Sequence, residues 1–215
     1  MIDAHFHRNG FATFMNTGAG REMRFFGIHP WQAAEPVDMT ALRSALDDDT
    51  EAGVGEIGLD RLKTKTIPGL QRASFAMQLE LAAELGRPAV LHGAKCWGEV
   101  VSACRPFKGR IPAFLFHGFS RSGGLIPAII DLNGYISVGP ALLNSHAVNY
   151  RTLARELPLE RTLLETDMDY ALHAQEALDT ISRLHSEFAA LRNLTPSALS
   201  EILDGNMQRF ISRPR

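Results

Sequence analysis

Seven short runs of apolar, β-branched or aromatic residues alternate along the chain with longer segments of helical periodicity. Strands that alternate with helices in this way indicate parallel β/α units rather than a β-sandwich. This alternation constrains the possible fold more than any other feature of the sequence. The strand candidates are Ile2–His7, Arg24–Ile28, Gly53–Ile57, Ala89–His92, Ala113–His117, Gly134–Val138 and Thr162–Thr166.

Between these runs, the spacing of apolar residues predicts helices. In Gln71–Leu85 apolar residues recur every three or four positions, and Gly86 and Pro88 follow the segment as stop signals. The other predicted helices are Thr40–Leu46, Trp97–Cys104, Leu125–Leu132, Tyr150–Glu156, Gln175–Leu191 and a last one that starts at Thr195-Pro196 and runs to about Leu203.

The length of the chain selects among α/β architectures. If eight β/α units share the 215 residues, each receives about 27, which is near the lower size limit of a closed barrel. We therefore expect an α/β protein with a compact, distorted or incomplete TIM-type (β/α) barrel of seven or eight strands. An open doubly wound sheet is the alternative. Without a linker, repeat or low-complexity segment, residues 1–215 are expected to form a single domain.

Charge and cysteine content restrict the partners and the compartment. The chain has 22 Lys and Arg against 24 Asp and Glu, so its formal charge of −2 gives no global field for coating nucleic acid. Cys96 and Cys104 form neither a CxxC motif nor a disulfide framework, which favours free thiols in a reducing compartment. With no signal-like or membrane-length apolar segment, we expect a cytoplasmic protein with no membrane contact and no obligate protein partner.

The first strand candidate carries a potential metal site. Ile2, Ala4 and Phe6 alternate with polar residues, and His5 and His7 therefore project from the same face of the strand. Two imidazoles on one strand face can reach a single metal ion. Alone, the pair is compatible with two surface histidines.

Further polar residues lie near the ends of other strand candidates: Glu56, His92, His117 and Asp167. In a barrel the carboxyl ends of the strands meet at one rim, where these side chains and the first two histidines would converge. Four imidazoles and two carboxylates suit a divalent cation with nitrogen and oxygen ligands. Taken singly, each histidine is compatible with a hydrogen-bonded strand end, Glu56 with a turn and Asp167 with a helix cap. Burying the whole set at one rim without a cation would be costly.

Taken together, these motifs resemble the TatD-like metal-dependent hydrolases, within the wider amidohydrolase-like barrels. The resemblance covers nearly the whole chain. It is carried by Asp3-Ala4-His5-Phe6-His7, Gly27-Ile28-His29-Pro30, Gly55-Glu56-Ile57-Gly58-Leu59-Asp60, Gln71, Phe75, Gln78-Leu79, His92, His117-Gly118-Phe119-Ser120, Glu165-Thr166-Asp167, Asn206 and Phe210.

The resemblance implies two divalent ions, with Zn, Mg, Mn and Ni all open as the native metal. His5, His7 and Asp167 would hold one ion and His92 and His117 the other, with Glu56 as a bridge between them. Asp167 would also accept a proton from the attacking water, so that Asp167 and Glu56 are the catalytic residues. His29 would contact a substrate phosphate; the alternative is a loop histidine packed against Pro30 and Trp31.

The chain departs from the family pattern beside the predicted metal site. Many members carry Ser-Arg-Asp after the fourth-strand histidine, whereas Gly93-Ala94-Lys95 follows His92 here. Lys95 would supply a cation for a phosphate, or it merely starts an exposed helix. Met168-Asp169-Tyr170-Ala171 replaces the usual Ala-Pro-Tyr-Leu, which leaves the substrate pocket open to question. Arg121, in a glycine-rich turn, is a further candidate phosphate contact.

The resemblance predicts a phosphodiester hydrolase, a DNase that trims 3′ ends of nucleic acid with a metal-activated water. Two alternatives stay open. The same two metals would also serve hydrolysis of a small phosphodiester, an ester or a cyclic amide. The chain would otherwise be a non-catalytic metal-binding protein that retains the ligand set.

Overall fold

Eight strands form one sheet whose neighbours follow the order of the chain. The computed structural model describes residues 1–9, 12–18, 20–33, 38–63, 67–120 and 123–212. The strands are β1 (Asp3–Arg8), β2 (Ala12–Asn16), β3 (Glu22–Phe26), β4 (Gly53–Asp60), β5 (Ala89–Ala94), β6 (Phe114–Phe116), β7 (Gly134–Val138) and β8 (Thr162–Leu164). From β3 to β8 every neighbouring pair is parallel.

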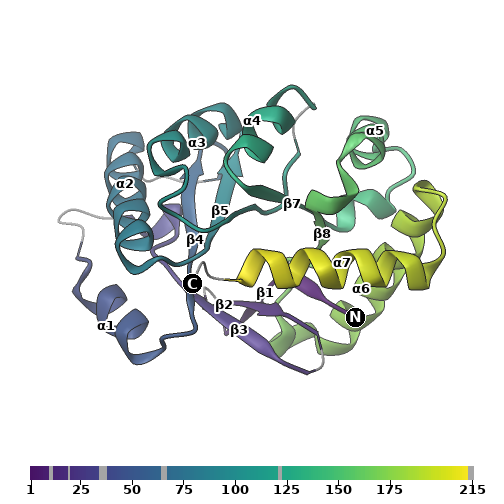
Figure 1. Ribbon diagram of the computed structural model, residues 1–215, viewed down its shortest axis with the longest axis horizontal. Helices are drawn as coiled ribbons and strands as arrows, with labels where there is room; N and C mark the ends of the chain where they lie inside the picture. Colours follow the sequence, from purple (N-terminus) through teal and green to yellow (C-terminus); the bar gives the residue numbers. More distant parts are fainter. Residues whose placement is uncertain (10–11, 19, 34–37, 64–66, 121–122, 213–215) are drawn as a thin grey trace.

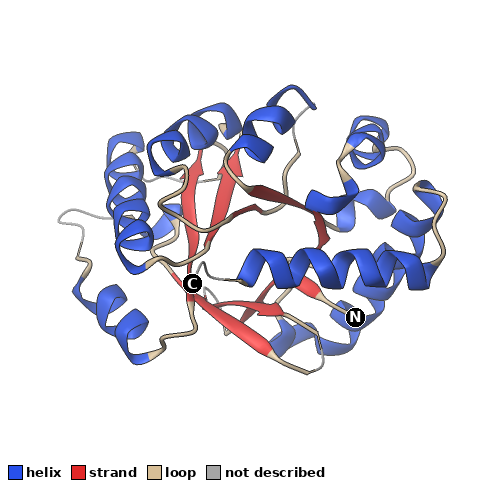
Figure 2. Ribbon diagram, in the orientation of Figure 1, coloured by secondary structure: helices blue, strands red, loops and turns tan. Residues whose placement is uncertain are grey.

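The sheet curls into a nearly closed barrel. The backbone N–H of His7 donates to the carbonyl of Met168 at 2.9 Å, and that of Asp167 donates to the carbonyl of His5 at 3.0 Å. These bonds join β1 to the segment directly after β8. The predicted α/β barrel is therefore confirmed, with the strands at the centre and the helices around them (Figure 2).

The start of the barrel differs from a β/α unit. Strands β1, β2 and β3 form an antiparallel meander, so the first strand is followed by a hairpin and not by a helix. Because two reversals restore the direction, β1 still runs parallel to β3 and to the remaining strands. The meander therefore keeps His5 and His7 at the same rim as the residues of later strands.

The helices lie where the sequence predicts them: five extend beyond their predicted bounds, the helix Trp97–Cys104 matches them, and the one predicted over Leu125–Leu132 is a residue shorter at each end. They are α1 (Thr40–Asp48), α2 (Pro68–Leu85), α3 (Trp97–Cys104), α4 (Ile126–Asp131), α5 (Val148–Glu156), α6 (Tyr170–Leu191) and α7 (Pro196–Ile211). Short 3-10 helices connect other elements: η1 (Pro30–Gln32), η2 (Arg105–Phe107), η3 (Gly123–Leu125), η4 (Pro140–Leu143) and η5 (Leu159–Arg161). Among the described residues, none of these helices has the length and apolar character that a membrane crossing requires.

Helix α7 covers the strands near the start of β8 and crosses in front of them in Figure 1. Asn206 on this helix donates from Nδ2 to the carbonyls of Leu159 and Thr162, both at 2.7 Å. Phe210 packs its ring against Phe25 and Tyr135. These buried contacts explain why the helix continues beyond Leu203, the predicted end. These contacts fix the amino-terminal end of β8 and leave its carboxyl end available for a functional site.

Candidate metal centre

The carboxylate of Glu56 lies at the middle of the histidine cluster. Glu56 is on β4 and is buried. Its Oε1 lies 2.5 Å from Nδ1 of His92 and 2.6 Å from Nε2 of His117, while its Oε2 lies 3.4 Å from Nε2 of His5 and 3.9 Å from Nε2 of His7. The two oxygens therefore face different imidazoles, and His29 also approaches Oε1, at 3.6 Å.

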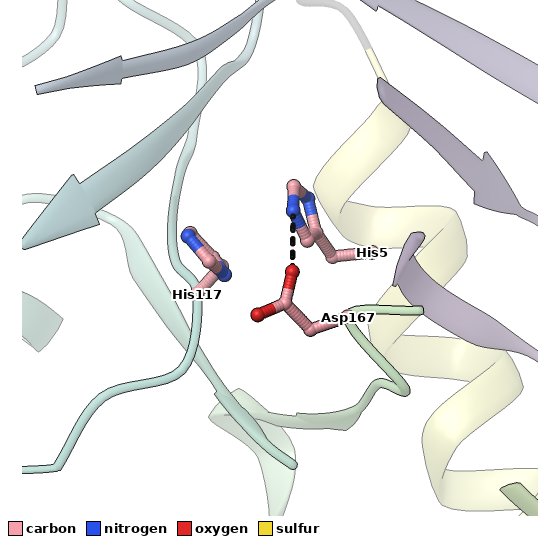
Figure 3. A group of neighbouring side chains, drawn as sticks. All are labelled: His5, His117 and Asp167. Carbon is pink, nitrogen blue, oxygen red and sulfur yellow. Dashed lines mark ion pairs between the residues drawn. The ribbon is translucent and has the colours of Figure 1, made fainter. Parts of the chain in front are cut away.

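Asp167 approaches the cluster from the segment after β8. Its Oδ1 lies 3.2 Å from Nε2 of His7 and 3.5 Å from Nε2 of His5, and its side chain is 49% exposed. Figure 3 shows this carboxylate directed toward His5, with His117 beside it. The residue has a left-handed φ of 55°, a conformation that aspartate tolerates better than most residues. All six predicted ligands are thus brought together at one end of the barrel.

The described residues form three groups whose potential ligand atoms lie within 4.8 Å of one another. They are His5, His117 and Asp167; His5, His7 and Glu56; and His29, Glu56 and His92. Two of these groups differ from the sets that the sequence resemblance implies. The ring of His5 lies closer to that of His117, with centroids 4.1 Å apart, than to that of His7, whose centroid is 5.0 Å away.

The carboxylates and imidazoles of the cluster stabilise each other's charged forms. Burial alone would raise the pKa of Glu56, but the charge and hydrogen bonding of His117, followed by His29 and His5, hold that pKa well below its usual range. Burial opposes protonation of His5, yet contacts with Asp167 and Glu56 raise its pKa to about 9. Contacts with His5 and His7 likewise outweigh burial and lower the pKa of Asp167. In the metal-free site the carboxylates are therefore ionised, and they favour positive charge on the groups around them.

A divalent cation fits this arrangement. Nε2 of His5 lies at 3.4 to 3.5 Å from the carboxylate oxygens, beyond the usual N–H···O distance, and neither ring nitrogen makes a hydrogen bond within the described part of the chain. Nδ1 of His92 and Nε2 of His117 lie 3.3 Å apart and face the same oxygen of Glu56. Converging nitrogen lone pairs beside ionised carboxylates are the donor set of zinc-type and manganese-type sites.

Two carboxylates that sequence reasoning missed support the imidazoles from behind. Asp60 Oδ2 lies 3.1 Å from Nε2 of His92, and Glu165 Oε1 lies 3.5 Å from Nδ1 of His117. Both acids are buried, and Ser137 donates to Glu165 at 2.5 Å. The sequence could have identified both acids, because Asp60 lies in the same motif as Glu56 and Glu165 in the same motif as Asp167. A carboxylate hydrogen-bonded to the outer ring nitrogen, as Asp60 is to His92, fixes the tautomer that leaves the inner nitrogen free to coordinate.

His29 lies against the cluster but turns its protonated ring nitrogen toward Glu56. Its Nδ1 accepts a hydrogen bond from the backbone N–H of Trp31 at 3.2 Å, so the proton of the neutral ring lies on Nε2. That Nε2 lies 3.6 Å from Oε1 of Glu56. A protonated Nε2 donates hydrogen bonds and cannot coordinate a metal. This geometry favours a contact with a substrate oxygen over a ligand role for His29.

Two cavities open beside the cluster and share His92, His117 and Asp167 as a common wall. One, of about 430 Å³, is also lined by Leu62, Lys95, Trp97 and Ser120, among others. The other, of about 330 Å³, is lined by His7, His29, Trp31, Glu56 and Asp169 besides the shared residues. Lys95 is exposed and precedes the first residue of α3 by two positions. Arg121, the remaining phosphate candidate, lies outside the described residues.

Sequence comparisons identify the family of the chain. The family model described as TatD related DNase matches residues 2–212. A 3'-5' ssDNA/RNA exonuclease TatD from Edwardsiella piscicida is 32% identical over 152 residues, which cover 68% of this chain and 57% of that protein. An uncharacterized metal-dependent hydrolase, YcfH from Escherichia coli (strain K12), is 26% identical over 189 residues, 86% of this chain and 71% of that protein. The chain thus matches little more than half the length of the exonuclease relative.

Solved structures show the same architecture. The crystal structure of YJJV, a TatD homolog from Escherichia coli K12, superimposes with a TM-score of 0.77 at 24% identity, covering 88% of this chain and 76% of that one. A hydrolase TatD family protein from Entamoeba histolytica superimposes with a TM-score of 0.72 at 16% identity, covering 86% and 73%. On the match over residues 2–212, the chain belongs to the TatD related DNase family.

Proposed function

We propose that this protein is a metal-dependent hydrolase that cleaves phosphodiester bonds at the ends of single-stranded nucleic acid. One observation carries the proposal: a buried carboxylate, Glu56, has two imidazoles on each of its oxygens, with Asp167 half-exposed opposite them. The names of the relatives, an exonuclease and a metal-dependent hydrolase, support the reaction class. We assign the hydrolase domain to residues 1–215.

The two-sided contacts of Glu56 support a pair of ions. His92 and His117, which face Oε1, would hold one ion, and His5 and His7, which face Oε2, would hold the other with Asp167. Glu56 would bridge them. Divalent ions in such a pair would polarise a phosphodiester and activate water for attack on phosphorus. The mixed nitrogen and oxygen set suits Zn²⁺, Mn²⁺ or Ni²⁺ and permits Mg²⁺.

The chain's own side chains supply the remaining functions. The half-exposed carboxylate of Asp167 borders both cavities and would accept a proton from water there. His29 would donate from Nε2–H to a phosphate oxygen, and Lys95 would add a positive charge from the neighbouring cavity. Arg121 stays a prediction from the sequence as a third phosphate contact.

Cavity size favours a second candidate, hydrolysis of a small phosphodiester. Spaces of about 330 and 430 Å³ match small ligands and single nucleotides rather than a duplex. Both readings use the same metals and residues, and a panel of oligonucleotides and small diesters separates them by relative kcat/KM.

We also propose a cytoplasmic location. The buried, unpaired thiols Cys96 and Cys104 are in keeping with a reducing compartment.

The test of the main proposal is the release of nucleotides from a single-stranded oligonucleotide with Mg²⁺ or Mn²⁺. Glu56→Ala removes the bridge and is expected to reduce the rate by at least about 10³-fold, because both ions lose a ligand. Glu84→Gln, at an exposed surface carboxylate of α2, serves as a control with unchanged rate. If wild-type protein and Glu56→Ala release nucleotides at equal rates, the activity is a contaminant and the proposal is wrong.

A further inference from the structure

The two cavities beside the metal cluster differ in chemistry. The larger contains Lys95 and Ser120, polar groups suited to a phosphate. The smaller contains an indole, Trp31, and the carboxylate of Asp169. Within the described part of the chain, neither Lys nor Arg lines the smaller cavity. The smaller cavity therefore suits an uncharged aromatic or hydroxylated group better than a phosphate.

Trp31 is exposed but held in place. Trp31 is 42% exposed. In η1 it lies between Pro30, which is buried, and Gln32, which is exposed. The indole Nε1–H donates to Oδ2 of Asp60 at 2.7 Å, and the ring meets His29 nearly perpendicularly, with centroids 4.8 Å apart. A large aromatic surface that is already fixed loses little conformational freedom when a planar ligand stacks on it.

The position of Trp31 relative to the cluster fits a nucleobase. Its tether Asp60 also contacts His92, so the indole is coupled to a residue of the wall that both cavities share. A phosphodiester at this shared wall would have one neighbouring nucleoside in each direction. The cavity of about 330 Å³ on the indole side is near the lower limit of small-ligand sites and has room for one nucleoside.

We propose that Trp31 is a stacking platform for the base of the terminal nucleotide, and that the rest of the strand leaves through the cavity lined by Lys95. This inference rests on the proposed function, because it places the terminal nucleoside on one side of the scissile phosphate and the rest of the strand on the other. Asp169 on the terminal side would repel a terminal phosphate and accept a hydrogen bond from a terminal sugar hydroxyl. Recognition by an aromatic face is tolerant of sequence, because every base has such a face.

The direct test is calorimetric binding of a mononucleotide, which carries no diester bond to cleave. Deoxyadenosine monophosphate is compared with 2-deoxyribose 5-phosphate, the same ligand without its base, in the presence of the divalent ion. Trp31→Leu, which keeps apolar bulk but removes the aromatic face, should weaken binding of the mononucleotide by about 5- to 100-fold. Trp31→Phe, which restores an aromatic face, should recover most of the loss. The baseless ligand should bind all three proteins alike.

Fluorescence gives an independent readout. The chain has two tryptophans, and Trp97 is buried, so Trp97→Phe leaves Trp31 as the only source of tryptophan emission. The mononucleotide should quench this emission, and 2-deoxyribose 5-phosphate should not. Calorimetry on the protein with both tryptophans intact covers the case in which Trp97→Phe does not fold.

The outcomes separate the platform from the proposed function. The platform is wrong if Trp31→Leu binds the mononucleotide as tightly as wild type, if the baseless ligand binds equally well, or if the mononucleotide does not bind. Quenching and a base-dependent affinity together with no oligonucleotide hydrolysis would leave the platform standing and refute the nuclease proposal. Oligonucleotide hydrolysis together with a mononucleotide affinity that does not depend on the indole would refute the platform and leave the nuclease proposal standing.

Discussion

His92 and His117 each turn one ring nitrogen to Glu56 and the other to a second buried carboxylate. For His92 the outer partner is Asp60, and for His117 it is Glu165. At the scale of single residues, the site is therefore built in two layers: acids lie behind both imidazoles, and the hydrogen bond of Asp60 to His92 selects the tautomer that can coordinate. Asp60 also accepts hydrogen bonds from the backbone N–H groups of Leu62 and Lys63, so its own orientation is fixed.

Asp60→Asn is expected to weaken metal binding by about 10- to 100-fold, as for other residues that orient a ligating histidine. An asparagine oxygen can still accept the two backbone bonds, but its amide then faces two other donors, Trp31 Nε1 and His92 Nε2. Isothermal titration with Zn²⁺ or Mn²⁺ measures the change. Trp31→Phe removes only the indole bond and is the matched control. If both variants bind metal like the wild type, Asp60 does not orient His92.

At the scale of elements, the sequence predicted the strands that carry ligands better than the way the barrel begins. The seven predicted runs correspond to β1 and β3–β8, and the predicted bounds of α3 are confirmed. The hairpin strand β2 was missed, although Asn9-Gly10 is a strong hairpin signal and Asn9 has the positive φ such turns require. Trp31 could not be assigned a role, because its partner Asp60 is 29 positions away in the sequence.

The two ends of the barrel sheet, β1 and β8, are joined by one buried carboxylate. Asp3 accepts hydrogen bonds from the backbone N–H and hydroxyl of Thr166 at 3.0 and 2.7 Å, and from the hydroxyl of Tyr170 at 3.0 Å. Burial outweighs these donors and raises the pKa of Asp3 to about 6. Asp3 lies two residues before His5 and Thr166 directly before Asp167, so this junction fixes ligands on both sides.

Asp3→Asn is expected to become more stable relative to wild type as the pH rises. Because the folded pKa exceeds that of an unfolded aspartate, the contribution of Asp3 to stability is full below about pH 4 and is lost as the pH rises through 6. Between pH 5 and 8 the free energy of unfolding of the metal-free wild type should fall by about 1 kcal/mol relative to the variant. Urea denaturation measures it, with the exposed Asp131→Asn as control. A constant difference across this range would contradict the raised pKa.

At the scale of the whole molecule, the candidate ligands come from β1, β4 and β5 and from the segments that follow β6 and β8, so the site draws on nearly the full circumference of the barrel. This spread explains why the ordered motifs predicted the family from sequence alone, whereas the shape of the substrate pocket could not be predicted. Residues that can bind a metal recur at strand ends, where the sequence shows them. The two cavities form only where loops that are distant in the sequence come together.

Because the ligands span the barrel, metal binding should stabilise the whole fold. A cation that binds the folded chain alone, at 100 times its Kd, adds about 2.7 kcal/mol. For a chain of this length, that corresponds to a rise in Tm of about 5 to 10 °C. Scanning calorimetry with Zn²⁺ or Mn²⁺, against protein treated with EDTA, measures the rise. Glu56→Ala should lose most of the rise, whereas Glu84→Gln should retain it. An equal rise in wild type and Glu56→Ala would place the bound metal elsewhere, and no rise at saturating metal would remove the physical basis of the proposed function.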